Sequence, residues 1–221
     1  MAHAEPMTTF LDPVADAAPA RPYHHGDLPA ALLAAAMMIL EADGIAGLTL
    51  RAVARRAGVS HMAPAHHFGD LTGLLSELAA LGFQQFAAAL GNAAVTAADD
   101  KVASLDEMGE AYVGFARDNP ALFQLMFRSE RLDPKRPALA AAMGRASDML
   151  TRAAGDFVEG EPVGPSLVQV AASVRAWSLV HGYALLLIDG RLDPTLARLA
   201  GAGSADATVL LRAVLGRSPP A

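Results

Sequence analysis

The sequence predicts an all-α protein, and three observations support that prediction. Of its 221 residues, 53% are hydrophobic but only 5% are aromatic, so the apolar content is mainly Ala, Leu and Val. Ala and Leu are strong helix formers, and the Val, Ile and Thr alternation that is typical of strands is missing almost throughout. Helix start signals followed by apolar residues at helical spacing recur along the chain.

Composition also limits the class of protein. The chain has no cysteine, which excludes disulfides and thiolate metal sites. Residues 1–22 are rich in Ala and Pro, and we expect a flexible leader there rather than a signal peptide. The longest apolar stretches, Ala30–Leu40 and Leu179–Ile188, are too short to span a membrane, so we expect a soluble cytoplasmic protein. The formal net charge of −6 counts mildly against a nucleic-acid partner.

Four helices are expected in the N-terminal part, each preceded by a side chain that can accept a backbone N–H. They are Leu28–Asp43 after Asp27 and closed by Gly44, Leu50–Ala57 after Thr49 and stopped by Gly58, a short one from Ser60 to about His67, and Leu71 to about Leu90 after Asp70.

Longer helices are expected in the C-terminal part. The first is opened by a capping box, Ser104 with Glu107, and ends at Asn119. The others are a short helix after Asn119-Pro120, then helices around Pro137–Val158, Pro165–Ile188 and Ala205–Leu215.

The stretch Leu50–Phe68 has the pattern of a helix-turn-helix. Val53 faces inward on the first helix, and Gly58 can supply the positive φ that a tight turn between helices requires. Ser60 would cap the second helix, whose first residues would point into a major groove of DNA. Two packed helices without any nucleic acid would produce the same spacing, so the pattern leaves both interpretations open.

Several segments resemble a known family. Tyr23–Leu28, Leu48–Ala54, Ala57–Ser60 and His67-Phe68 look like the DNA-binding domain of the TetR family, and the likeness runs over residues 23–83. In the C-terminal half, Tyr112–Phe127 and the Trp177–Gly182 segment resemble one branch of that family, whose ligand domain carries a Trp-His-Gly signature. The resemblance implies a leader at 1–22, a helix-turn-helix domain at 23–83, and an effector-binding and dimerisation domain at 84–221.

The resemblance also implies roles for individual residues. Arg51 and the amides that begin the second and fourth helices would approach phosphates. The third helix would lie nearest the base edges, with its end towards the backbone. The implied DNA-binding residues are Thr49, Arg51, Ser60, His61, Met62, Ala63, His66 and His67. The implied partners are a palindromic operator, a small hydrophobic effector and a second copy of the chain, and the implied activity is repression that the effector relieves.

Two departures from the family concern phosphate contacts. Ala65 stands where the family usually has Tyr, and Leu71 stands where it usually has Lys. From Arg21 to Gly82 there are four arginines, no lysine and five acids, a balance of 4 − 5 = −1. Because each neutralised phosphate adds salt-dependent affinity, we expect a flatter salt dependence than that of a typical relative. A dimeric ligand sensor that has lost strong DNA binding is therefore the alternative function.

Methionines and aromatic residues recur at helical spacing in the C-terminal half. Core packing explains any one of them, but Met and aromatic side chains with few charges also suit an apolar ligand pocket. His181 is either a hydrogen-bonded core histidine or a polar contact to the ligand. The candidate ligand-binding residues are Met108, Tyr112, Phe115, Phe123, Met126, Phe127, Met143, Trp177 and His181.

The helix around Pro165–Ile188 is apolar almost all round, so it needs two packing partners. We therefore expect that this helix and the last one form a four-helix interface between two chains.

Other interpretations of the chain find less support. The chain has no nucleophile elbow, phosphate-binding glycine loop or two-histidine metal motif, so we expect neither an enzyme nor a cofactor. His61 and His66 lie five residues apart, off the spacing of helical ligand pairs, so no metal site is expected.

Overall fold

The computed structural model describes residues 27–96, 101–128, 130–155, 166–201 and 206–216. This part of the chain contains ten helices and no strand, which confirms the all-α class. The helices are α1 (Leu28–Gly47), α2 (Leu50–Ala57), α3 (Ala63–Phe68), α4 (Leu71–Thr96), α5 (Lys101–Asp118), α6 (Pro120–Arg128), α7 (Pro137–Gly155), α8 (Leu167–Ile188), α9 (Asp193–Gly201) and α10 (Ala207–Val214).

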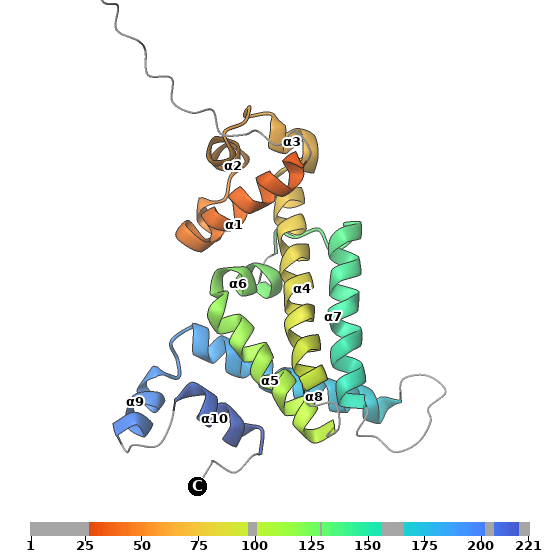
Figure 1. Cartoon of the computed structure of the whole chain (residues 1–221), viewed down its shortest axis with the longest axis vertical. Helices are drawn as coiled ribbons and strands as arrows, with labels where there is room; N and C mark the ends of the chain where they lie inside the picture. The colour runs from red at the N-terminus through yellow and green to blue at the C-terminus, as the bar shows by residue number, and fades with distance from the viewer. Residues whose placement is uncertain (1–26, 97–100, 129, 156–165, 202–205, 217–221) are drawn as a thin grey trace, which may run out of the picture.

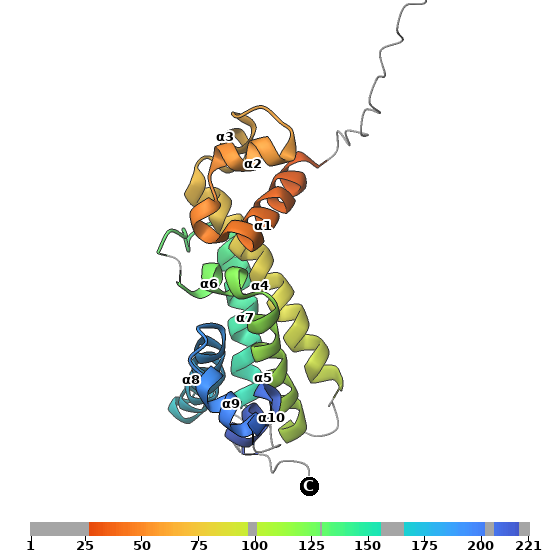
Figure 2. The same ribbon diagram turned by 90° about the vertical axis from the view of Figure 1, so that its left-hand side faces the viewer.

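Helix α4 runs along the long axis of the molecule, from α3 to the level of α8 (Figure 1). Helices α1, α2 and α3 gather around its first turns, at one end of the long axis. Helices α5 and α7 lie along the rest of α4, and α8, α9 and α10 lie at the opposite end from α2 and α3 (Figures 1 and 2). The two groups of helices thus share one 26-residue element.

Several helix ends follow the expected capping chemistry. Asp27 accepts the Ala30 N–H at 3.1 Å, and Thr49 accepts the Ala52 N–H at 3.1 Å, so both begin their helices as expected. Gly58 closes α2 with φ +70°, a conformation that costs glycine little. Gly44 has φ +67° and interrupts α1, although the helical trace resumes briefly up to Gly47.

Ser60 does not cap the third helix, and that expectation was wrong. Helix α3 begins at Ala63 after Met62, and no side chain caps it. Pro64 has no N–H to satisfy, and the Ala63 N–H is accepted by the Ser60 backbone carbonyl at 3.0 Å. Residues 60–62 therefore form a turn rather than the start of a helix.

The Ser104 capping box was also wrong. Helix α5 already begins at Lys101, and the Ser104 hydroxyl points to the Ala94 carbonyl at 3.5 Å. The capping box of this half lies at α8 instead, where Ser166 accepts the Gln169 N–H at 3.2 Å and the Gln169 side chain accepts the Ser166 N–H at 3.0 Å.

Other helix bounds differ from the expectation in smaller ways. Helix α4 continues to Thr96, and α7 is described as far as Gly155, because residues 156–165 lie outside the described part. Helix α9 was not expected, although Asp193-Pro194 is a typical first turn. The expected leader, residues 1–22, also lies outside the described residues.

Three helices are longer and more apolar than the sequence pattern suggested. By length and composition alone, Leu28–Gly47, Leu71–Val95 and Leu167–Ile188 could cross a membrane, which corrects the expectation that no stretch is long enough. Uninterrupted apolar runs underestimated them, because isolated polar residues do not end a helix. Buried residues make up 39% of the α4 window but only 17% of the α8 window, so α8 keeps the most apolar surface uncovered.

Further contacts from the C-terminal part reach the N-terminal turns of α4 and also α1. Arg136, just before α7, donates to Glu77 of α4 at 2.7 Å, and both side chains are about a quarter exposed. The Asp133 N–H donates to the hydroxyl of fully buried Ser76 at 2.9 Å. Helix α6 also packs against α1. Helix α4 is therefore not the sole link between the two parts in the described structure.

The first turn of α4 leaves no room for a side chain at Gly73. A Cβ atom there would lie 2.0 Å from the Phe68 carbonyl oxygen and 2.7 Å from the Arg136 guanidinium. We expect Gly73→Ala to lower the free energy of unfolding by about 1–3 kcal/mol, because the backbone must shift. Gly144→Ala in α7, with open space around it, should raise the free energy of unfolding by about 0.5–1 kcal/mol. Urea unfolding of both variants tests this, and equal effects would contradict it.

Candidate DNA-binding face and ligand cavities

The first three helices pack around a small apolar core. Leu48, Val53 and Ala54 are buried at or near zero exposure, and Phe68 at the end of α3 is 6% exposed. Leu48, Val53 and Phe68 belong to the same continuous core as the first turns of α4. This packing holds α2 and α3 in fixed orientation and leaves their outer faces open.

The outer face of α2 is basic. Arg51, Arg55 and Arg56 are all exposed there, opposite buried Val53 and Ala54. Arg55 and Arg56 lie in the last turn, where positive charge also compensates the helix dipole, so structure alone explains their presence. Arg51 lies in the first turn, where that explanation fails. Arg51 lies close to Thr49 in sequence, so a cation stands beside the free backbone amides that begin α2.

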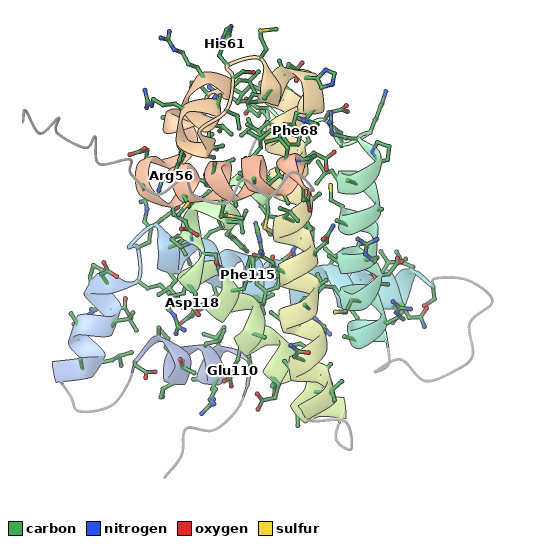
Figure 3. All side chains as sticks on the ribbon, turned by 45° about the horizontal axis from the view of Figure 1, so that its top comes forward. Arg56, His61, Phe68, Glu110, Phe115 and Asp118 are labelled. Carbon is green, nitrogen blue, oxygen red and sulfur yellow. The ribbon has the colours of Figure 1, made fainter. Side chains whose placement is uncertain are left out.

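The turn before α3 is the most exposed part of this face. Ser60, His61 and Met62 are exposed, and Met62 keeps 61% of its surface open to solvent. In Figure 3, His61 lies at the outer edge of the helix-turn-helix and points away from the rest of the molecule. On α3, buried Pro64 and Phe68 face inward while His66 and His67 are exposed.

Five of the eight predicted DNA-binding residues come together on one surface, and Thr49, Arg51 and His61 lie outside it. Ser60, Met62, Ala63, His66 and His67 line a shallow hollow. Leu28 at the start of α1 and Ala65 complete its wall. None of the described residues that line the hollow is acidic.

Three acidic residues of this half are engaged elsewhere. Asp27 caps α1, and Asp70 caps α4 by accepting the Gly73 N–H at 2.8 Å. Glu77 is paired with Arg136, a residue outside the segment whose charges gave a balance of −1. Counting Arg136 with its partner Glu77 brings the formal balance of this half from −1 to 0.

An aromatic cluster lies between α4, α5, α6 and α8. Phe86 meets Tyr112 edge to face with ring centroids 4.8 Å apart, and Phe123 and Phe127 lie 4.7 Å apart. His181 lies 4.9 Å from Phe127 and 5.5 Å from Phe123. Contacts of this geometry add stability beyond simple apolar burial.

A hydrogen-bonded chain crosses the cluster. The Trp177 indole N–H donates to the Tyr112 hydroxyl oxygen at 3.1 Å, and that hydroxyl lies 2.8 Å from Nδ1 of His181. Trp can only donate, so the Tyr112 oxygen accepts the indole N–H and keeps its own O–H free to donate. Burial raises the pKa of fully buried Tyr112 far above its ordinary value of 10, against the lowering effect of the Trp177 hydrogen bond.

Two cavities lie on either side of Trp177. We call the first the α5 cavity: it measures about 400 Å³ and lies between α5, α8 and the end of α10. The second, the α7 cavity, measures about 480 Å³ and lies between α4, α6, α7 and α8. Both volumes lie in the range of small-molecule sites. Trp177, Ser173 and Leu150 line both cavities.

The candidate ligand-binding residues divide between these cavities and the core. Met108 and Tyr112 line the α5 cavity, and Met126, Phe127 and Met143 line the α7 cavity. Phe115, Phe123 and His181 line neither. The sequence analysis missed Phe83 and Phe86 of α4, and Val170 and Val174, which share a helical face with Trp177. Among the described residues, no group of three or more His, Asp or Glu side chains could hold a metal ion.

The ionisation of Tyr112 predicts a loss of stability in alkali. Because its folded pKa is raised, only the unfolded chain loses this proton just above pH 10, and unfolding becomes easier as the pH rises. Tyr112→Phe should flatten this decline by about 1.4 kcal/mol per pH unit. Trp177→Phe, which keeps the phenol, should retain most of it. Chemical unfolding on both sides of pH 10 measures the slopes, and an unchanged slope in Tyr112→Phe would contradict the prediction.

Comparisons with known proteins agree with this arrangement. Residues 32–78 match the family model of bacterial regulatory proteins of the tetR family, and residues 105–214 match that of the tetracyclin repressor-like C-terminal domain. A search of curated proteins found no match.

Solved structures share the fold along most of the chain. A protein of unknown function from Rhodococcus sp. RHA1 is 34% identical, with 89% of this chain and 96% of that one covered and a TM-score of 0.72. The TetR family transcriptional regulator PfmR from Thermus thermophilus is 22% identical, with 84% and 94% covered and a TM-score of 0.55. With both halves matched by family models, the chain belongs to the TetR family of bacterial transcriptional regulators.

Proposed function

We propose that this protein is a transcriptional repressor that binds operator DNA through α2, the 60–62 turn and α3, and that a small apolar ligand releases it. The observation that carries the proposal is the outer face of the helix-turn-helix. Arg51, Arg55 and Arg56 are exposed on α2, and most residues of the turn and α3 are exposed as well, while three acids of this half cap helices or pair with Arg136.

Each residue of this face has a proposed role. Arg51 and the amides beginning α2, which Thr49 caps, would contact phosphates. Ser60, His61, Met62 and Ala63 would meet base edges in the major groove, because the first three are exposed in the turn before α3 and Ala63 begins that helix. His66 and His67, exposed on α3, would lie towards the DNA backbone.

We also propose that two copies associate through α8 and α10. Val168, Leu186 and Val214 remain 63%, 47% and 44% exposed in the single chain, which is unusual for such large apolar side chains. A symmetric pair would cover them and present two α3 helices to a palindromic operator. The proposed working place of such a regulator is the cytoplasm.

The proposed effector is uncharged and mainly apolar. Among the described residues that line the α7 cavity there is no Asp, Glu, Lys, Arg or His, and its polar groups are the hydroxyls of Ser147, Thr151 and Ser173. Burying an unpaired charge among such walls is costly, so a charged ligand is disfavoured.

The Trp177, His181 and Gly182 signature supports placing the chain in the Trp-His-Gly branch of the family.

Release requires that ligand binding reach the DNA-binding face. Contacts of α6 with α1, and of Arg136 with Glu77, supply that route, because α6 and α7 also form walls of the α7 cavity. A ligand that favours a different placement of α6 or α7 would reposition α1 and the start of α4 together.

A dimeric ligand sensor without strong DNA binding is the second candidate function. Ala65 at the hollow and Leu71 at the start of α4 favour it, because neither can contact phosphate. This second candidate function predicts that the natural protein does not bind operator DNA specifically.

The phosphate contacts can be counted from the salt dependence of binding. With DNA flanking its own gene, Arg51→Ala should flatten the slope of log affinity against log salt by about 0.9, and Leu71→Lys should steepen it by about the same amount. Arg145→Ala, exposed in the middle of α7, is the matched control and should change nothing. Fluorescence anisotropy at several salt concentrations measures the slopes. Absence of specific binding by the natural protein would favour the sensor function.

Ligand and DNA should oppose each other. In a panel of uncharged aromatic and aliphatic compounds, those that quench Trp177 should also weaken operator binding by about 5- to 150-fold, and DNA should weaken their binding equally. Val174→Glu places a charge in the α7 cavity and should abolish both effects while sparing operator affinity without ligand. Ala141→Glu, exposed on α7 outside the cavity, should behave like the natural protein. Compounds that quench Trp177 yet leave operator affinity unchanged would contradict ligand release.

A further inference from the structure

We propose that the α5 and α7 cavities are two halves of one site for an elongated, uncharged, mainly apolar ligand, and that the Trp177 side chain is the movable partition between them. The inference rests on the proposed ligand-sensing function and deepens it, because it specifies the shape of the effector and the residue that admits it.

The cavities adjoin along a short wall. Leu150 of α7 and Ser173 and Trp177 of α8 line both of them, so these side chains separate about 400 Å³ from about 480 Å³. Trp177 is the largest of the three.

Trp177 has few restraints for a residue in such a position. Its side chain is 43% exposed, although it lies beside a buried aromatic cluster. The Tyr112 hydroxyl accepts its N–H at 3.1 Å, and its ring is tilted against that of His181 at 5.6 Å. Opening the partition would break one hydrogen bond of modest net strength and expose little additional apolar surface.

Tyr112 cannot move in the same way. It is fully buried, packs edge to face on Phe86 and Phe123, and lies within hydrogen-bond distance of His181. Tyr112 thus stays in place, and the Trp177 indole is hydrogen-bonded to it when the partition is closed.

The walls define which molecule would fit. The α7 cavity is apolar and aromatic with scattered hydroxyls, whereas Asp106 and Arg175 lie in the lining of the α5 cavity. An apolar chain would therefore occupy the α7 cavity and pass Trp177, and a neutral polar end group would lie in the α5 cavity. That end also reaches Val214 and Leu215, at the end of α10.

Linear primary alcohols from hexanol to dodecanol test the length of the site without DNA. Calorimetry should give one dodecanol per chain, and affinity should rise about fourfold per methylene up to the longest members. Ala172→Leu narrows only the α5 cavity and Ser147→Leu only the α7 cavity, and both keep Trp177. Each should weaken dodecanol binding by about tenfold or more, with little effect on hexanol. The control Ala141→Leu, outside both cavities, should bind like the natural protein.

A second variant tests the partition itself. Trp177→Phe removes the N–H that holds the ring to Tyr112, so dodecanol should bind about two- to tenfold more tightly while hexanol is unchanged. Two dodecanol molecules per chain, or a Leu variant that leaves dodecanol binding intact, would overturn the single site. Lack of saturable alcohol binding would overturn it as well. If dodecanol spans the site but does not release operator DNA, this inference stands and ligand release fails.

Discussion

Burial of α4 on several sides is the constraint on which the rest of the structure depends. Leu74, Leu75, Leu78, Phe86 and Leu90 have no exposed surface, and they belong to one continuous core that contains both halves of the molecule. Close-packed interiors do not deform gradually, so α4 cannot slide or tilt without repacking the helices around it. Gly73 and Gly82 extend this constraint, because a Cβ atom at either would lie less than 3 Å from its neighbours. Any movement of α4 relative to the C-terminal half therefore carries the helix-turn-helix with it.

The sequence predicted best the features that are encoded locally. Asp27, Thr49, Gly44 and Gly58 were identified correctly, because a cap or a positive φ depends on a few neighbouring atoms. Ser60 and Ser104 were predicted wrongly as helix caps. Each is a residue type that often caps a helix, but α3 and α5 begin at other positions. Pro64, which has no N–H, decides where α3 begins, and packing against α4 decides where α5 begins.

The candidate sites could be predicted only in part, for a different reason. The same pattern of Met and aromatic residues at helical spacing includes Met108, Tyr112, Phe123 and Phe127, yet only some of these line a cavity. Which apolar side chain is in the core and which faces a void depends on how completely the neighbouring helix covers it. That information lies in the relative placement of α7 and α8, which no periodicity encodes. The charge balance of the N-terminal segment was incomplete for the same reason, because Glu77 is paired with Arg136, 59 positions further along the chain.

The exposed flank of α7 has a consequence for how the proposed ligand sensing could evolve. Met143, Ser147 and Thr151 form a wall of the α7 cavity, yet all three are solvent-exposed and none belongs to the buried core around α4. Under the proposed function, mutations there would alter which ligands are accepted at little cost in folding. Recognition of a new ligand could then diverge while the proposed DNA binding through α1–α4 is retained.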